Sequence, residues 1–272
     1  MLKNKILEGI DEFGGPDEKY YAFDWDDNIV TMPTKILVKD EDDDIIGMST
    51  EDFAEFREIL GKEPFEYEGH TIVGYAEDPY RYFRVTGDKQ FIVDAMIAKP
   101  GPAWADFVEA INNGSIFAIV TARGHTPSVI KEACYNYIVS NFNGIDSNEL
   151  VRNLEKYRDL ADKEVISKRE MIREYLDLCR FYPVSFGQSA ESNPEEAKVK
   201  ALDEFMEYVK EVSSKIQKDA FLKNKINNYF IPKIGFSDDD LKNVDVVKKH
   251  FEKKPENIIK TYLTKGGIKK EY

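Results

Sequence analysis

Two runs of apolar residues in the chain lead directly into clusters of carboxylates. Asp24 and Asp26 come after the run at residues 20–23, and residues 238–240, all aspartates, follow the run at residues 233–237. Such runs are typical of buried strands in a parallel sheet, whose ligands bind beyond the carboxyl ends of the strands. Two carboxylate clusters placed there would repel each other. A hard cation can offset that repulsion, and oxygen ligands favour Mg²⁺ over zinc.

The elements that must position these carboxylates follow from the pattern along the chain. Apolar runs alternate with amphipathic stretches, which predicts an α/β fold with a parallel sheet flanked by helices. Further strands are predicted at residues 115–121, 181–186 and 258–263. Helices are predicted at residues 103–112, 127–142, 193–219 and 241–253, and residues 146–180 are predicted to be mostly helical and highly charged.

Composition narrows the class of protein. The chain has 272 residues, 42% of them hydrophobic, and a net charge of −13. This excess of acid disfavours a protein that coats nucleic acid or an anionic membrane. No apolar run reaches the length of a transmembrane helix, and charges within residues 1–15 break any signal-peptide core. Because the two cysteines form no disulfide framework, a cytoplasmic location is predicted. The net charge and the lack of a long apolar run predict that neither a membrane nor extended nucleic acid is a partner.

Three strand ends carry motifs whose order resembles that of the haloacid dehalogenase (HAD)-like hydrolases. Residues 23–28, Phe-Asp-Trp-Asp-Asp-Asn, resemble the first motif; residues 119–124 resemble the second and residues 234–239 the fourth. The resemblance spans nearly the whole chain and implies a Rossmann-like core that performs Mg²⁺-dependent phosphoryl transfer through an aspartyl-phosphate. Asn28 departs from the pattern, which usually has Thr or Val there, but its side chain can cap the turn.

The resemblance also implies a role for each matching residue. Asp24 is the expected nucleophile, and Asp26 is the expected general acid and base. Thr121 is expected to hydrogen-bond the transferring phosphoryl group. The expected Mg²⁺ ligands are the Asp24 carboxylate, the backbone carbonyl of Asp26, and Asp238 with Asp239 adjacent to it.

A lysine should precede the last motif, and Lys198 and Lys200 are the candidates. The apolar stripe of the predicted helix includes Leu202, and four residues before it lies Lys198, on the inward face. Lys200 lines up with Glu204 on a solvated face. The helix pattern therefore favours Lys198 as the catalytic lysine, with a structural position along the edge of the core as the alternative.

Two assignments near the site have open alternatives. Asp238 can be paired with Asp239 in a paired-acid motif, or with Asn243 in a longer-spaced form. Arg123 follows the second motif and is predicted to bind the substrate phosphate, a structural salt bridge being the alternative. His125 is expected to be a loop residue rather than a catalyst.

The spacing of the motifs predicts an insert. Asp24 and Thr121 are 121 − 24 = 97 residues apart, whereas a minimal βαβ unit needs roughly 30. Residues 34–99 are therefore expected to form a small α+β cap over the site, with a hairpin, a helix capped by Ser49, and an irregular, aromatic-rich stretch at residues 64–99. Residues 1–33 and 100–272 are then the core. The cap's many aromatic residues are expected to form a small core of their own, and recognition of a substrate such as a nucleotide is the alternative.

The motifs together predict a Mg²⁺-dependent phosphatase acting on a small phosphomonoester: a nucleotide, a sugar phosphate or a nucleic-acid end. The alternative is a non-enzymatic module that keeps the fold and the metal site for binding or assembly. Residues 24–35 are also similar to phage-encoded members of the family. That similarity admits a virion component, located in the host cytoplasm or in the virus particle.

Overall fold

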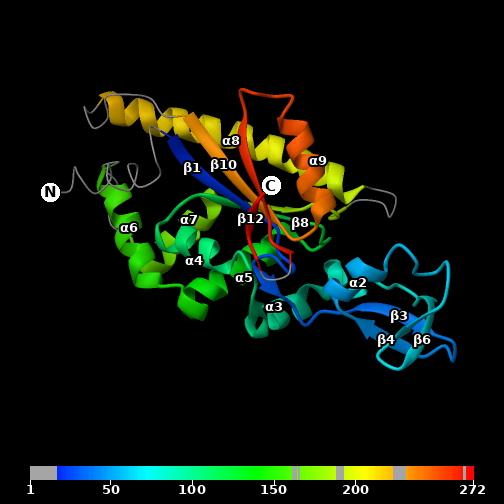
Figure 1. Cartoon of the computed structure of the whole chain (residues 1–272). Helices are drawn as coiled ribbons and strands as arrows, with labels where there is room; N and C mark the ends of the chain where they lie inside the picture. Colours follow the sequence, from blue (N-terminus) through cyan, green and yellow to red (C-terminus); the bar gives the residue numbers. More distant parts are fainter. Residues whose placement is uncertain (1–16, 161–163, 165, 188–192, 223–230, 266–267) are drawn as a thin grey trace.

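A six-stranded sheet forms the centre of the molecule in the computed structural model (Figure 1). The structure describes the chain except for residues 1–16, 161–163, 165, 188–192, 223–230 and 266–267. The strand order is β12-β11-β10-β1-β8-β9, and every neighbouring pair is parallel except β11 with β12. The strands are β1 (Asp17–Phe23), β8 (Phe117–Thr121), β9 (Arg180–Pro183), β10 (Ile231–Asp238), β11 (Ile258–Leu263) and β12 (Lys270–Glu271).

The strand order reverses direction at β1, which lies between β8 and β10. The chain moves outward from β1 through β8 to β9, then crosses back to β10 and continues to β11. A reversal of this kind leaves a crevice at the carboxyl ends of the central strands, where ligands of open α/β sheets bind. Phe23 pairs with Ile119 on one side and with Ser237 on the other. The residues that follow Phe23 and Ser237 therefore emerge side by side at that edge.

Helices cover both faces of this sheet, as predicted. In Figure 1, α8 (Pro194–Leu222) and α9 (Leu241–Phe251) lie above the sheet. Below it lie α4 (Trp104–Asn112), α5 (Pro127–Val139), α6 (Ser147–Leu160) and α7 (Lys168–Leu178). Successive strand residues feed opposite cores, because side chains alternate across a strand. Ala22 packs with Leu202 of α8, whereas Phe23 packs with Phe107 of α4.

A second, antiparallel sheet lies beside the first at the lower right of Figure 1. Its order is β4-β3-β6-β5, and five buried apolar side chains, four from its strands together with Leu60, form a separate small core, as expected. The elements are β3 (Ile36–Asp40), β4 (Ile45–Met48), α2 (Thr50–Phe56), β5 (Phe65–Tyr67) and β6 (His70–Tyr75). The predicted cap of α2 is confirmed: Ser49 accepts a hydrogen bond from the backbone N–H of Asp52.

The predicted insert begins and ends at a short two-stranded ribbon, β2 (Val30–Thr31) with β7 (Lys99–Pro100). After the small sheet the chain passes through η1 (Arg81–Phe83) and η2 (Val85–Gly87) into α3 (Asp88–Ile97). Phe91 and Ala95 of α3 are buried in the core of the larger sheet, not in that of the small one. The insert therefore contains one part that stands beside the core and one part that packs into it. The division of the chain into domains stays a prediction.

Three details differ from the predicted elements. Residues 64–99 are not irregular, since they contain β5, β6 and α3. The charged stretch at residues 146–180 is divided into two helices, α6 and α7. A short turn, η3 (Phe142–Gly144), precedes α6, and a capping box between Ser167 and Glu170 begins α7. Strand β9 ends at Pro183 and not at residue 186 as predicted, because residues 184–187 form a turn, in which Gly187 has a φ of +67°.

Within the described residues, no helix combines the length and the apolar character that a bilayer-spanning segment needs.

Candidate active site

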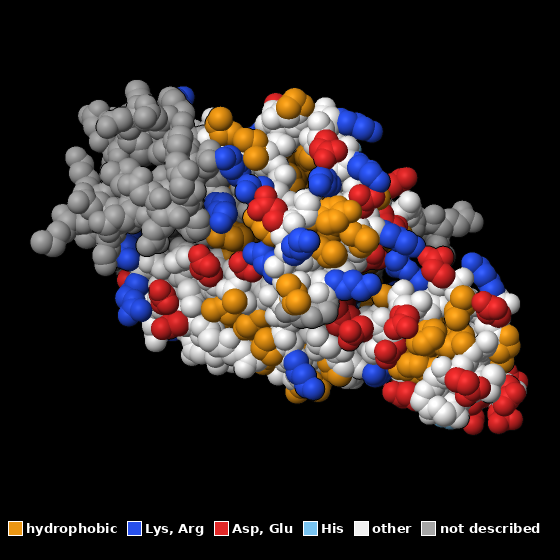
Figure 2. Space-filling view, viewed as in Figure 1, with side chains coloured by type: hydrophobic (Ala, Val, Ile, Leu, Met, Phe, Trp, Pro, Cys, Tyr) orange, Lys and Arg blue, Asp and Glu red, His pale blue; other side chains and the backbone are white. Residues whose placement is uncertain are grey.

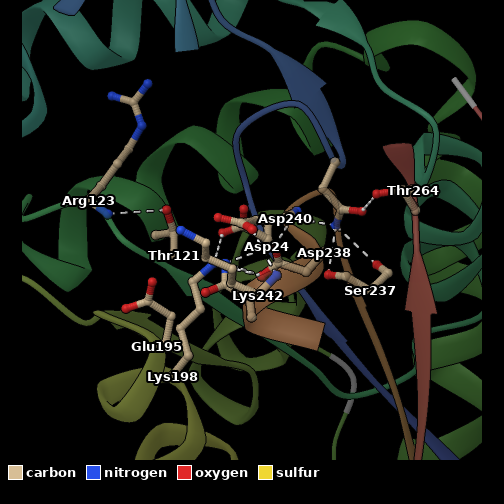
Figure 3. Close-up of polar contacts among 12 residues, drawn as sticks. Asp24, Thr121, Arg123, Glu195, Lys198, Ser237, Asp238, Asp240, Lys242 and Thr264 are labelled. Atoms are coloured by element: carbon tan, nitrogen blue, oxygen red, sulfur yellow. Dashed lines mark hydrogen bonds and ion pairs between the residues drawn. The ribbon is translucent and has the colours of Figure 1, made fainter. Parts of the chain in front are cut away.

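Three carboxylates meet at the carboxyl ends of the two central strands. Asp24 follows β1, Asp238 ends β10 and Asp239 comes next, and their ligand atoms all lie within 4.8 Å of one another. Asp24 is 6% exposed and Asp238 is fully buried. Figure 3 shows Asp24 and Asp238 facing each other across the strand ends. These three residues, whose carboxylates the resemblance implies as metal ligands, are called the carboxylate cluster below.

Lys198 lies inside this cluster. It comes from the first turns of α8, is 1% exposed, and places its Nζ 3.0 Å from Asp24 Oδ1 and 2.7 Å from Asp238 Oδ2 (Figure 3). Lys200, the other candidate, is exposed. The prediction that Lys198 faces inward and Lys200 faces solvent is thus confirmed, while the catalytic role of Lys198 stays a prediction.

One ammonium does not balance three carboxylates. Burial raises the pKa of Asp24 to about 8, against the lowering effect of Lys198 and with a further rise from Asp238. Burial, Asp238 and Asp24 also raise the pKa of Asp239. Burial alone would lower the pKa of Lys198, but the attraction of Asp238 and Asp24 outweighs it and raises that pKa. The pocket therefore favours an additional positive charge.

The carboxylate cluster fits a hard divalent cation. Asp24 Oδ1 is buried and accepts no hydrogen bond, since the nearby Lys198 Nζ approaches it as an ion pair outside hydrogen-bond geometry. Lys198 supplies one positive charge to three carboxylates, and buried negative charge that is left uncompensated costs stability. All side-chain donors of the cluster are oxygens, which suits Mg²⁺ and is unlike a zinc site.

Hydrogen bonds from neighbouring residues fix the orientation of the Asp238 carboxylate. Asn243 donates from Nδ2 to both Asp238 oxygens, at 2.9 and 3.1 Å, and the backbone N–H of Asp240 donates to Oδ1 at 2.9 Å. Of the two residues considered as a partner of Asp238, Asp239 thus belongs to the carboxylate cluster, whereas Asn243 orients Asp238.

Asn28 ties three strand ends together. Its Nδ2 donates to the carbonyl oxygens of Asp24 and Ser237 and to Ser237 Oγ, at 3.0 to 3.1 Å, and its Oδ1 accepts from Thr264 Oγ1 at 2.8 Å. The bond to Asp24 is the turn cap expected from the sequence. The bonds to Ser237, near the end of β10, and to Thr264, just after β11, were not expected (Figure 3). A buried amide with every bond satisfied fixes the backbone that carries Asp24.

Backbone packing also constrains the first loop. The N–H groups of Gly101 and Ala103 donate to the carbonyls of Ile29 and Asn28, each at 2.9 Å. A Cβ at Gly101 would lie 2.5 Å from the Asn28 carbonyl oxygen. Only glycine allows this approach, so the chain returning from the predicted insert closes directly against the loop of Asp24.

Thr121 ends β8, the strand next to β1, and is 1% exposed. Its Oγ1 accepts a hydrogen bond from the backbone N–H of Arg123 at 3.3 Å. The Arg123 side chain points away from the carboxylate cluster (Figure 3). Its Nε and Nη2 donate to the two carboxylate oxygens of Asp26, both at 2.7 Å.

The structural salt bridge considered for Arg123 is therefore formed, and its partner is Asp26. The Asp26 side chain is 17% exposed, so it remains reachable from solvent, whereas that of Arg123 is 1% exposed. The expected contact between Arg123 and a substrate phosphate, and the expected metal contact of the Asp26 carbonyl, stay predictions.

The small sheet reaches the rim of the site through α2. Arg57, just after α2, donates to Asp240 at 2.9 Å, and Thr50 donates to Asp27 at 2.5 Å. Burial raises the pKa of Asp27 to about 6. Both contacts join the small sheet to residues that follow β1 and β10, so α2 stands at the edge of the carboxylate cluster.

No protein-family model matches the chain, and no curated protein or solved structure matches it significantly. Site geometry and the sequence motifs are therefore the basis for a functional assignment.

Sequence reasoning missed the residues that support the carboxylates. Asn243 was considered only as a possible substitute for Asp239, and Thr264 carried no signal because it lies 236 residues from Asn28. The one available signal was Asn28 itself, a polar residue at a position where the resembling motif has Thr or Val.

Proposed function

We propose that the chain is a Mg²⁺-dependent phosphatase of the HAD-like superfamily that acts on a small phosphomonoester. One observation carries the proposal: the buried Asp24 carboxylate lies at the switch point of a parallel sheet, beside Lys198 and two further carboxylates. A purely structural protein has no need to gather three carboxylates around one ammonium at this position, because the excess negative charge costs stability. The strand order and the motifs at β1, β8 and β10 support the superfamily assignment.

The chemistry follows from the positions of the side chains. Asp24 attacks the phosphorus atom, an O–P bond forms, and the ester P–O bond breaks to leave an aspartyl-phosphate. Asp26 gives a proton to the leaving oxygen and later removes one from the water that hydrolyses the acyl phosphate. Lys198 and the Thr121 hydroxyl stabilise the charge on the transferring oxygens. Asp24, Asp238 and Asp239 would hold Mg²⁺, which keeps these carboxylates ionised and neutralises phosphoryl charge when bound.

The charge distribution supports a small substrate. Residues 34–78, which contain the small sheet, hold 14 acidic and 4 basic residues. Figure 2 shows acidic side chains gathered over this end of the molecule. A polyanion lying across the site would be repelled by that surface. A single phosphate group, which can be drawn in by Lys198 and a bound cation, would not need to contact it.

The decisive assay is hydrolysis of p-nitrophenyl phosphate and phenyl phosphate, with and without Mg²⁺, by the wild-type protein and Asp24→Asn. We expect Mg²⁺-dependent turnover that the substitution abolishes, because an amide of nearly the same shape is a poor nucleophile. Asp106→Asn on α4, which lies outside the site, is the matched control and should keep wild-type turnover. Unaltered turnover in purified Asp24→Asn would refute the mechanism.

Metal binding can be measured without turnover. At about 100 times its Kd, Mg²⁺ should stabilise the fold by about 2.7 kcal/mol, which corresponds to a rise of roughly 5–10 °C in Tm. Asp239→Asn should lose at least about half of that rise, since one anionic ligand is gone. NaCl at matched ionic strength is the control. A rise in Tm without any turnover would favour the non-enzymatic metal-binding module instead.

A further inference from the structure

Each of the three side-chain nitrogens of the buried Arg123 has a polar partner. Its guanidinium makes two parallel hydrogen bonds with Asp26, both 2.7 Å long. The guanidinium carbon lies 4.4 Å from the ring centre of Phe83 and 5.0 Å from that of Phe91. Paired bonds of this kind fix the plane of the carboxylate as well as its distance. The aromatic rings in turn fix the guanidinium.

The remaining nitrogen of Arg123 is also engaged. Nη1 lies 3.2 Å from His125 Nε2, and His125 Nδ1 lies 2.8 Å from Asp88. Since Asp88 accepts, Nδ1 carries the proton and Nε2 accepts from Arg123. Burial and the charge of Arg123 lower the pKa of His125, which keeps the ring neutral and the hydrogen bonds in this direction.

A third set of hydrogen bonds links Arg123 to α3 through Thr34. Arg123 Nη2 donates to Thr34 Oγ1 at 3.3 Å, and Thr34 donates to Asp94 at 2.7 Å. Asp88 and Asp94 both belong to α3, the part of the predicted insert that packs into the core. The backbone N–H of Gly124 also donates to the carbonyl of Phe83 at 2.8 Å. The segment returning from the small sheet therefore holds Arg123 from several sides.

This arrangement argues against a phosphate ligand at Arg123. A substrate phosphate could reach the guanidinium only by displacing Asp26 from both of its bonds, and the side chain is 1% exposed. Breaking a buried ion pair costs about 3–5 kcal/mol. Without such displacement, the guanidinium holds the Asp26 carboxylate, which is 17% exposed, in one orientation at the rim of the site.

We infer that Arg123, oriented by His125 and Asp88, is a positioning residue for Asp26 and does not bind the substrate phosphate. The inference rests on the proposed function, in which Asp26 transfers protons. A misplacement of about 1 Å can cost 100-fold in rate, so a proton-transfer group needs such support.

The test compares a good and a poor leaving group. General acid catalysis contributes roughly 10²–10⁴-fold and matters most when the leaving oxygen is basic. Arg123→Lys keeps the charge but loses the paired bonds. It should lower kcat for phenyl phosphate about 10-fold or more, and kcat for p-nitrophenyl phosphate about 3-fold or less. The Ki of orthophosphate should stay within about 2-fold of wild type, because no phosphate ligand is lost.

Further variants make the result specific. Arg123→Lys combined with Asp26→Asn should be no slower than Asp26→Asn alone, since both changes remove the same function. Arg84→Lys, a control on an exposed arginine paired with Asp78, should change neither ester. Asp88→Asn is a milder change that should show the same leaving-group dependence at smaller size. It serves as the test if Arg123→Lys does not fold, as judged by circular dichroism.

Two outcomes overturn the inference alone. One is an equal loss for both esters with a raised Ki for orthophosphate, which would make Arg123 a phosphate ligand. The other is an additive effect of Arg123→Lys and Asp26→Asn. Absence of turnover with either ester in the wild-type protein would instead refute the proposed function, and the inference with it.

Discussion

The sharpest prediction concerns Lys198, whose ammonium is enclosed by Asp24 and Asp238 at 3.0 and 2.7 Å. We expect Lys198→Met to destabilise the Mg²⁺-free protein strongly at about pH 8. With an effective dielectric constant of about 20, each of these ion pairs is worth about 6 kcal/mol. Removing a lysine also removes its own desolvation cost of several kcal/mol. The expected net loss is about 3–5 kcal/mol of unfolding free energy, as for other buried ion pairs that lose one partner.

The loss should depend on pH and on Mg²⁺ in a defined direction. An acid whose pKa is raised in the folded state, as burial raises that of Asp24 to about 8, costs stability as the pH rises from its unfolded value toward the folded one. Relative to wild type, Lys198→Met should therefore recover stability as the pH falls from about 8 to about 5. Mg²⁺ should restore more stability to the variant than to wild type, because the cation replaces the missing charge.

Urea unfolding followed by tryptophan fluorescence measures these differences, with Lys200→Met as the matched control. The control changes an exposed lysine two residues away on the same helix, so its effect should stay within about 0.5 kcal/mol. In the phosphatase assay, Lys198→Met should be slower by roughly 10²–10³-fold and the control should not. Equal stability of the two variants, or a loss that neither pH nor Mg²⁺ changes, would refute the reasoning.

Two further predictions concern the supporting residues. Because burial lowers the pKa of His125, the free energy of unfolding of the wild-type protein should be highest above about pH 6.5 and decline as the pH falls below it, when the buried ring must take up a proton. Urea midpoints of His125→Gln should show a shallower decline with falling pH, and a steeper decline would contradict the neutral ring. Asn28→Ala leaves several buried groups without partners and should cost about 2–4 kcal/mol in the same titration. Asn153→Ala, which removes one bond to a backbone carbonyl, should cost less than about 1.5 kcal/mol, and equal losses would show that the Asn28 bonds are not coupled.

The sequence predicted the elements whose burial leaves a periodic pattern. The runs that became β1, β8, β10 and β11 are apolar because the sheet is covered on both faces, and the aspartates at two of their ends stand out against that background. The inward position of Lys198 followed from the helical repeat of the apolar stripe. These features depend on residues close together in the chain, so one amino-acid sequence is enough to reveal them.

Other features were missed for two different reasons. The hairpin of β5 and β6 had a readable signal, since Glu68 and Gly69 at its turn both have positive φ, at +50° and +84°, and glycine in a two-residue turn is typical of such hairpins. The pairing of Arg123 with Asp26 had none, because the two residues are 97 positions apart and no local pattern links them. The supporting bonds of Asn28 are long-range in the same way.

The central place of β1 in the sheet has a consequence for the order in which the chain acquires structure during synthesis. The small sheet is complete once residue 75 has been made, but β10 ends 238 − 24 = 214 residues after Asp24. At about 5–20 residues per second, a ribosome needs roughly 10–40 s for that interval. Throughout it, one edge of β1 has no partner strand and Asp24 has neither Lys198 nor Asp238 beside it. The carboxylate cluster therefore cannot form until β10 has been made, whereas all four strands of the small acidic sheet are available much earlier.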